Sequence, residues 1–414
     1  MKNNRLYTPE GVRDYLPEEL IRKNRAHQAL ERVFESFGYN RASSPTLEYA
    51  DVFEVTGGTA GGNMYKLIDR DGAILTLRSD LTPAMARIAA TNYSEKSFPL
   101  RLSYFENAFR YNENYQGKEK EFTQAGVELI GYSDTDADAE IVALSVFTLD
   151  AAGLENYRID VSDVGFLHGI IKETGLDEND MQILQKYIID TEYTAVEAFI
   201  KQKNVPPGIE ELLRKLPFLI GGSELLDEAE KLTSSPEAKK GIARIRRLYE
   251  ILRDYGVSER VTVDLGLTGH LDYYTGLIMR GYAPGAGFRI LDGGRYDQLM
   301  AKFGLTAPAV GFAIEMNVLL EALTQNQTER ERLCPETLIA YTEKGRPDAL
   351  GVCAKFRAEG LRVEAHPFPE ESAAVAYSAE RGHGGVLFFC GGNAAVINMK
   401  TGDRKSASIE ELKK

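Results

Sequence analysis

Apolar residues first recur at helical spacing between Pro17 and Phe37. A proline suits the first turn of a helix, and Gly38 is a natural residue at which a helix ends. The segment therefore predicts a long amphipathic helix near the start of the chain. Its apolar positions are Leu20, Ile21, Leu30, Val33, Phe34 and Phe37.

Short apolar-rich runs, separated by Gly, Pro and Asn, follow this helix. They occupy residues 43–53, 73–83, 99–110 and 121–132. Runs of this length between turn residues predict strands, and we expect these strands to be antiparallel. The next apolar face begins after Asp134, Asp136 and Asp138, an arrangement typical of a helix N-terminus.

Between about residues 166 and 255 the chain consists almost entirely of helix-forming residues, which predicts an inserted helical subdomain. Strand-like runs return at 260–267, 275–283 and 288–297, and residues 309–323 predict a strand that leads into a helix. We expect these later strands to complete the first sheet.

These patterns predict two domains joined by a linker. Residues 1–325 form the first domain, with the helical insertion at about 166–255, and the polar segment 326–333 is the linker. Residues 334–414 alternate strands with helices, which predicts a small α/β domain.

The composition is that of an ordinary globular protein. The 414 residues carry a formal net charge of −13, and 43% of them are hydrophobic. This length is sufficient for cores that need neither disulfides nor structural metal. The acidic balance argues against non-specific nucleic-acid binding, and no apolar run is long enough to span a bilayer. We therefore expect a cytoplasmic protein with no membrane association.

The cysteines and histidines show no spacing typical of metal ligands. Cys334, Cys353 and Cys390 are the only cysteines, and the five histidines form no HExxH or HxH pair. We expect no metal site, and we expect the three cysteines to be reduced residues of a core.

Gln124 and Glu128 are candidates for more than packing. Their even separation within a predicted strand places both side chains on one face of a sheet. Two interpretations are open here, a solvent-facing pair and a recognition face. The segments 271–276 and 292–299 combine tyrosine, aspartate and glycine, which suits a small polar ligand, although GGRYD alone is equally consistent with a hairpin turn.

Five segments together resemble the catalytic domain of histidyl-tRNA synthetases in order and spacing. They are LRSDLTPAMAR at 77–87, FR at 109–110, EFTQAGVELIG at 121–131, LDYYTG at 271–276 and GGRYD at 293–297. The resemblance covers about residues 8–325. It implies an α+β fold of the class II aminoacyl-tRNA synthetase type, in which helices flank an antiparallel sheet. It also implies a homodimer formed through the early helix and the strand around Pro45, and a shortened anticodon-binding-like domain at the C-terminus.

The same resemblance implies a binding site for free L-histidine. Asp80 and Thr82 correspond to the residues that meet the amino group, although the synthetases usually have Glu at the first position. Gln124 and Glu128 match strand residues that contact the amino acid. Glu128 is suited to accept a hydrogen bond from an imidazole N–H.

Three further residues complete this resemblance. Tyr274 and Tyr296 match the two tyrosines that enclose the imidazole ring. Arg110 matches the arginine at the carboxylate and α-phosphate position. A histidine-shaped pocket is therefore expected to be largely intact.

The residues that would activate histidine with ATP are not retained. Two phosphate-binding arginines, a glutamate near the metal-bound nucleotide and two arginines of a charged turn are replaced. The replacing residues are Gly269, Met316, Asn112, Lys118 and Lys120. Along the sequence His270 is the only nearby replacement cation. Losing one such electrostatic stabiliser costs a factor of roughly 10² to 10³ in rate, so the resemblance implies that the chain's own adenylation chemistry is lost and that it needs no cofactor.

With these changes the sequence resembles the synthetase paralogues that serve as the regulatory subunit of ATP phosphoribosyltransferase. This family implies a non-catalytic protein of histidine biosynthesis, assembled with a short-form catalytic subunit in a hetero-oligomer and mediating feedback by histidine, with no tRNA bound. Two alternatives stay open, a divergent histidyl-tRNA synthetase and an orphan histidine sensor. An RNA-binding role has less support, because residues 334–414 lack an aromatic-rich basic face.

Overall fold

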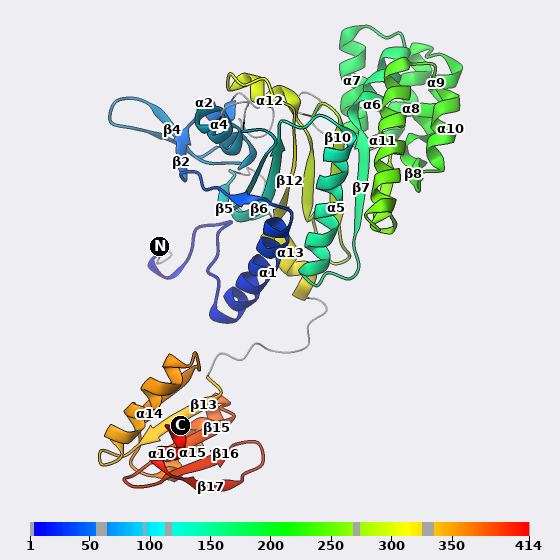
Figure 1. Ribbon diagram of the computed structural model, residues 1–414. Coiled ribbons are helices and arrows are strands. Elements are labelled where there is room, and N and C mark those ends of the chain that lie inside the picture. The colour runs from blue at the N-terminus through cyan, green and yellow to red at the C-terminus, as the bar shows by residue number, and fades with distance from the viewer. Residues whose placement is uncertain are drawn as a thin grey trace. The chain divides into compact units, whose positions relative to one another are not determined.

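A computed structural model describes residues 4–54, 64–93, 97–111, 118–267, 274–324 and 335–413. The chain divides into two compact units, which are described separately. The larger contains a nine-stranded and a three-stranded sheet, and the smaller contains a five-stranded sheet (Figure 1). The predicted linker, 326–333, lies outside the described residues, so the domain limits stay a prediction. Within the described ranges, every helix is too short or too polar to cross a membrane.

The predicted first helix is confirmed as α1 (Pro17–Ser36). Its buried face packs on the large sheet, where the Phe34 ring contacts the rings of Phe105 and Phe312. Gly38 follows the helix with φ of 81°, a left-handed conformation that glycine adopts without strain. The position of the helix and its end before Gly38 are therefore both confirmed.

The large sheet has the strand order β1-β5-β6-β12-β11-β10-β7-β9-β8. All neighbours from β5 to β7 along this order are antiparallel, as predicted, whereas β1 pairs with β5 and β7 with β9 in parallel. The bounds are β1 (Asn40–Arg41), β5 (Leu100–Phe109), β6 (Glu121–Ile130), β7 (Arg158–Asp163), β8 (Ile220–Gly221), β9 (Val261–Asp264), β10 (Leu277–Tyr282), β11 (Leu291–Arg295) and β12 (Ala309–Glu315).

The two faces of the central strands differ in chemistry. One face belongs to the main hydrophobic core, into which α1 and α5 (Thr135–Ala151) pack and which buries Val127, Leu129 and Phe312. Because side chains alternate along a strand, Gln124 and Glu128 point to the opposite face. The functional site is built on that second face.

The segment predicted as a helical insertion folds into helices α6 to α11, which lie beside β7 and β10 (Figure 1). We call these helices the helical insertion. Its one strand, β8, pairs with β9 of the large sheet. The bounds are α6 (Val164–Glu173), α7 (Glu178–Ile189), α8 (Tyr193–Lys203), α9 (Pro207–Lys215), η3 (Leu216–Phe218), α10 (Leu225–Leu232) and α11 (Pro236–Asp254), followed by η4 (Ser258–Arg260).

A separate three-stranded sheet has the order β2-β4-β3. Only part of the predicted strand at 43–53 is extended, because the chain turns into a short helix after Tyr49. The bounds here are η1 (Asn4–Leu6), β2 (Leu47–Tyr49), α2 (Asp51–Glu54), β3 (Lys66–Ile68), β4 (Ile74–Leu77) and α4 (Thr82–Asn92), and the large unit also contains α12 (Asp297–Lys302) and α13 (Met316–Thr324).

The smaller unit is an α/β fold with hydrophobic clusters on both faces of its sheet. Cys353 is buried there as predicted, but Cys390 is exposed, so the expectation of a core position is wrong for that cysteine. The strand order is β14-β13-β15-β16-β17. The bounds are β13 (Thr337–Tyr341), α14 (Arg346–Ala358), β14 (Val363–Pro367), α15 (Glu371–Arg381), β15 (Gly385–Phe389), β16 (Ala394–Asn398), β17 (Arg404–Ala407) and α16 (Ile409–Leu412).

Candidate functional site

Strand β6 carries the first two candidate residues on its non-core face. Gln124 is 4% exposed and Glu128 only 1% exposed. Buried polar side chains need hydrogen-bond partners, and a buried carboxylate is costly without them. The interpretation of this pair as a solvent-facing one is therefore wrong.

Three hydroxyl groups surround the Glu128 carboxyl group. Tyr296, directly after β11, donates to Oε2, and Tyr104 of β5 donates to Oε1 at 3.3 Å. Thr82, at the start of α4, provides the third hydroxyl. Burial raises the pKa of Glu128 to about 8, although these hydrogen bonds favour the ionised form and so oppose that shift. We call Glu128, Thr82, Tyr104 and Tyr296 the Glu128 cluster.

Tyr104 is the member of this cluster that the sequence did not indicate. It lies opposite Gly126 in the register of β5 and β6, and a Cβ at Gly126 would lie 2.4 Å from the Tyr104 hydroxyl oxygen. The available signal was the predicted antiparallel pairing of the two strands, which places alternate residues of each on the same face.

Two more glycines make room for the site. Gly311 pairs with Glu128 across β12 and β6, and a Cβ there would lie 2.0 Å from Glu128 Oε2. Gly294 has φ of 154°, and its Cβ would lie 2.7 Å from Cδ1 of Tyr274. The segment GGRYD is thus a strand end beneath Tyr274 that leads into α12, so its interpretation as a hairpin turn is wrong.

The turn before α4 brings Asp80 and Thr82 to β6. The Leu81 N–H donates to Asp80 Oδ1 at 2.7 Å and to Gln124 Oε1 at 3.2 Å. This shared donor fixes the carbonyl end of the Gln124 side chain against the turn. Asp80 and Gln124 consequently lie side by side at the edge of the Glu128 cluster.

Arg110 lies at the end of β5. Its Nε donates to the carbonyl oxygen of Ser79 at 2.9 Å, and its guanidinium lies over the Phe122 ring, 4.9 Å from the centroid. Its terminal nitrogens are 4.0 Å from Asp80 and 3.7 Å from Glu315. Arg110 therefore lies between Asp80 and Glu315, the residue directly before the replaced position Met316. We call the region around Glu315 the predicted ATP half.

Tyr274 is the last of the predicted residues. Burial, with the charges of Asp292 and Asp80, raises the pKa of its phenol, which therefore stays neutral. The structure gathers all of the predicted site residues on one face of the large sheet. We call this group the predicted pocket, and histidine binding by it stays a prediction. Its members are Asp80, Thr82, Arg110, Gln124, Glu128, Tyr274 and Tyr296.

Sequence reasoning missed two arginines at the predicted ATP half. Arg280 of β10 lies 3.4 Å from Asp292, and Arg289 also forms an ion pair with Asp292. Burial raises the pKa of Glu315, while Arg110 and Arg289 act to lower it. Two cations other than His270 therefore lie near Glu315 and Tyr274, and the expectation for His270 itself stays a prediction.

Two of the replaced positions, Asn112 and Gly269, lie outside the described residues, and so does His270. Lys118 is described and lies over the Phe288 ring, 5.2 Å from its centroid, and Met316 is buried at the start of α13. Among the residues that the structure describes, no three His, Cys, Asp or Glu side chains group as metal ligands.

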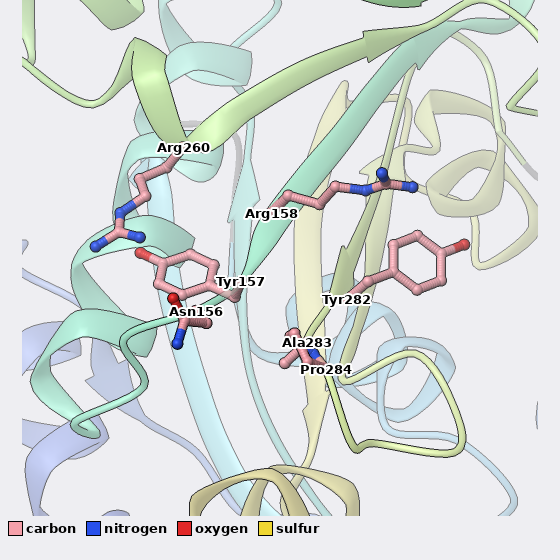
Figure 2. A pocket seen from close by; sticks show the side chains of 7 residues that line it. All are labelled: Asn156, Tyr157, Arg158, Arg260, Tyr282, Ala283 and Pro284. Atoms are coloured by element: carbon pink, nitrogen blue, oxygen red, sulfur yellow. The ribbon is translucent and has the colours of Figure 1, made fainter. Parts of the chain in front are cut away.

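A separate cavity of about 520 Å³ lies at the far end of β10 from Tyr274 (Figure 2). Arg260 lies over the ring of Tyr157 and Arg158 over the ring of Tyr282, at 4.9 and 5.8 Å from the centroids. Figure 2 shows the two arginine side chains pointing away from each other. Two arginines that bind one anion must point toward a common point. Since these two do not converge, the cavity does not offer them as a joint site for an anion.

The fold and the site define a protein of the histidyl-tRNA synthetase-like class. The family model described as histidyl-tRNA synthetase matches residues 11–319. A solved histidyl-tRNA synthetase from Nostoc sp. PCC 7120 shares the fold with a TM-score of 0.82 at 20% identity, covering 98% of each chain.

More similar relatives narrow this class. The ATP phosphoribosyltransferase regulatory subunit of Acetivibrio thermocellus is 39% identical and covers 99% of each chain. That of Caldanaerobacter subterraneus is also 39% identical, over 88% of this chain and 95% of the relative. The crystal structure of an ATP phosphoribosyltransferase regulatory subunit/histidyl-tRNA synthetase from Bacillus halodurans C matches with a TM-score of 0.84 at 32% identity, covering 93% of this chain and 98% of that one. The chain belongs to the family of ATP phosphoribosyltransferase regulatory subunits.

Proposed function

We propose that this chain is a non-catalytic subunit that assembles with a short-form ATP phosphoribosyltransferase catalytic subunit and activates it for the first step of histidine biosynthesis. Relatives that bear the regulatory-subunit name match it over nearly their whole length, which supports the same role here. The test is phosphoribosyl-ATP formation by a short catalytic chain with and without this protein.

L-histidine is the ligand of the predicted pocket in this proposal, and the Glu128 cluster is the observation that carries it. The Glu128 carboxyl group is 1% exposed and takes hydrogen bonds from three hydroxyls, which leaves capacity for one further hydrogen bond from a ligand. An imidazole N–H suits this remaining hydrogen bond, and Tyr274 and Tyr296 supply aromatic walls for its ring.

The charges at the other end of the predicted pocket suit the amino-acid backbone. Asp80 offers a carboxylate for the ammonium group, and Arg110 offers a guanidinium for the carboxylate. These two side chains lie 4.0 Å apart at their nearest charged atoms. A zwitterion placed against them would meet a charge of opposite sign at each end.

Feedback by histidine follows from linkage. If histidine binds one arrangement of the subunit better than another, and the catalytic subunit prefers the other, histidine lowers activity by that difference in affinity. Couplings of about 1 to 3 kcal/mol, typical of allosteric proteins, would give 5- to 150-fold changes.

We also propose that the chain has lost histidine adenylation and does not act on tRNA. The arginines at the predicted ATP half are all committed to carboxylates, Arg110 to Asp80 and Glu315, and Arg280 and Arg289 to Asp292. A triphosphate would have to compete with these ion pairs for each guanidinium. No histidine-dependent exchange of pyrophosphate into ATP is expected.

The second candidate function is a divergent histidyl-tRNA synthetase. The presence of Arg280 and Arg289 beside Glu315 and Tyr274 favours it, since these cations occupy the predicted ATP half. Pyrophosphate exchange separates the two candidates, because only the synthetase would catalyse it. An orphan histidine sensor would bind histidine without affecting any catalytic subunit.

A homodimer within the larger assembly completes the proposal. The strand that follows Pro45 carries Leu47 and Tyr49, which are 50% and 61% exposed, and Leu67, on the same face of the small sheet, is 46% exposed. Apolar side chains gathered on one small sheet mark an interaction surface. This supports self-association at the region that the family resemblance implies.

A further inference from the structure

The predicted pocket is joined to the helical insertion at Gly276. This glycine follows Tyr274 by two residues, and its carbonyl oxygen accepts a hydrogen bond from the Val164 N–H at 2.9 Å. Val164 begins α6, the first helix of the insertion. A displacement of the Tyr274 segment therefore acts on the first turn of that helix.

The Tyr296 segment is tied to the same place. The Thr275 N–H donates to the carbonyl oxygen of Arg295 at 2.7 Å, and the Asp297 N–H donates to the Thr275 hydroxyl at 3.0 Å. Tyr274 and Tyr296 thus belong to two segments that are hydrogen-bonded to each other. A ligand held between these tyrosines contacts both segments at once.

Two arginines flank this junction. A Cβ at Gly276 would lie 3.1 Å from Cδ of Arg295 and 3.5 Å from a terminal nitrogen of Arg244. Arg295 is 3% exposed, donates through Nε to Asp138 at 2.9 Å and lies 3.1 Å from Asp297. It therefore anchors the Tyr296 segment to α5 on the body of the larger unit.

Arg244 makes the corresponding connection on the insertion side. It extends from α11 and donates to Asp163 Oδ1 at 2.9 Å, and the same carboxylate oxygen accepts from the Gly165 N–H in the first turn of α6. Helices α6 and α11 pack with almost no space between them, since a Cβ at Gly169 would lie 2.4 Å from the Ala238 nitrogen. A shift of α6 therefore carries α11 with it.

We infer that Arg244 is a positioning residue that couples occupation of the predicted pocket to the arrangement of the helical insertion. The coupling runs from Tyr274 and Tyr296 through Gly276 to α6, and the Arg244–Asp163 pair transmits it to α11. This inference rests on the proposed binding of histidine. In this inference the helical insertion is the part of the subunit whose arrangement changes when histidine binds.

Hydrogen–deuterium exchange on the full chain, with and without saturating L-histidine, tests the coupling. Histidine is expected to slow exchange in the first turns of α6 and α11 by about 5-fold or more, the lower end of typical coupling. In Arg244→Gln this slowing of exchange by histidine is expected to be lost. The fold-change in the calorimetric Kd for histidine is expected to be smaller than the fold-change in exchange that is lost. Arg244→Lys keeps one donor to Asp163 and is expected to restore part of the response.

Arg247→Gln is the matched control, because Arg247 lies on the same helix and pairs only with the exposed Glu250 among the described contacts. It is expected to respond as the wild type does. A wild type that binds histidine with unchanged exchange in α6 and α11 would overturn the coupling alone, as would an intact response in Arg244→Gln. A wild type that binds no histidine would remove the proposed sensing function and the coupling together.

Discussion

At the scale of single residues, Glu128 is the group whose chemistry most depends on its surroundings. Its carboxyl group is buried among three hydroxyls with a pKa raised to about 8. At pH 7, below that pKa, the protonated form predominates without a ligand, and a hydrogen bond from a bound imidazole N–H would favour the ionised form. The protonation state of one buried side chain is thus part of how the site would recognise histidine.

The stability of the protein should depend on pH through Glu128. Between its ordinary pKa of 4.5 and the raised value of about 8, the folded state holds a proton that the unfolded state has released. This contribution is present in full below pH 4.5 and is lost as pH rises to 8, by up to about 1.4 kcal/mol per pH unit.

Glu128→Gln removes this titration, because the amide carries no ionisable proton. Urea unfolding at pH 5.5, 7 and 8.5 should show its stability increasing relative to wild type as pH rises. The exposed Glu259→Gln serves as control and should follow wild type at every pH. Parallel curves for Glu128→Gln and wild type would contradict the raised pKa.

Substitutions in the Glu128 cluster should weaken histidine binding. Glu128→Ala removes a hydrogen bond to a charged or proton-sharing group and is expected to raise the Kd by about 10- to 150-fold. Tyr296→Phe leaves the carboxyl in place with one donor fewer and is expected to have a smaller effect. Isothermal titration calorimetry measures both, with Tyr7→Phe, at a tyrosine that is 71% exposed, as control. An unchanged Kd in Glu128→Ala would exclude this placement of the imidazole.

At the scale of elements, the glycines of β11 and β12 decide whether the site can exist. A methyl group at Gly311 would overlap Glu128 Oε2 and the carbonyl oxygen of Val127, 2.3 Å away. Gly311→Ala is therefore expected to destabilise the fold by about 1 to 3 kcal/mol in urea unfolding and to abolish histidine binding.

Gly287→Ala is the control for this substitution, because a Cβ at Gly287 has no atom within 4 Å among the described residues. It should leave both stability and histidine affinity close to those of wild type. If Gly311→Ala behaves like this control, the close packing of β12 against Glu128 is required neither for stability nor for histidine binding.

Much of the fold could be predicted from local patterns in the sequence. The 3.6-residue repeat located α1, and the turn residues between short runs located β5, β6 and β10 to β12. The burial of Gln124 and Glu128 could not be predicted, because an even spacing shows that two residues share a face and not which face is covered.

The missed residues of the site share one cause. Tyr104 meets Glu128 through the pairing of β5 with β6, and Arg280 meets Asp292 through the pairing of β10 with β11. Contacts of this kind depend on strand register, which local patterns do not specify. The predicted pocket residues themselves came from the family resemblance, since no local pattern relates Asp80 to Tyr296.

At the scale of the whole molecule, the exposed face of the small sheet should support self-association. Tyr49→Glu places a charge on the face that carries Leu47, Tyr49 and Leu67 and should shift the protein from dimer toward monomer in sedimentation velocity. Its effect on folding is expected to be small, because the Tyr49 side chain is 61% exposed. Ile220→Glu, on another exposed apolar residue, is the control. A wild type that sediments as a monomer would contradict the proposed homodimer.

In the proposed assembly this chain regulates a catalytic partner and catalyses no reaction itself. The most direct test measures phosphoribosyl-ATP formation by a short-form catalytic chain alone, with this protein, and with this protein plus L-histidine. We expect activity to appear only on mixing and to fall when histidine is added. No change in rate on mixing would contradict the proposed regulation.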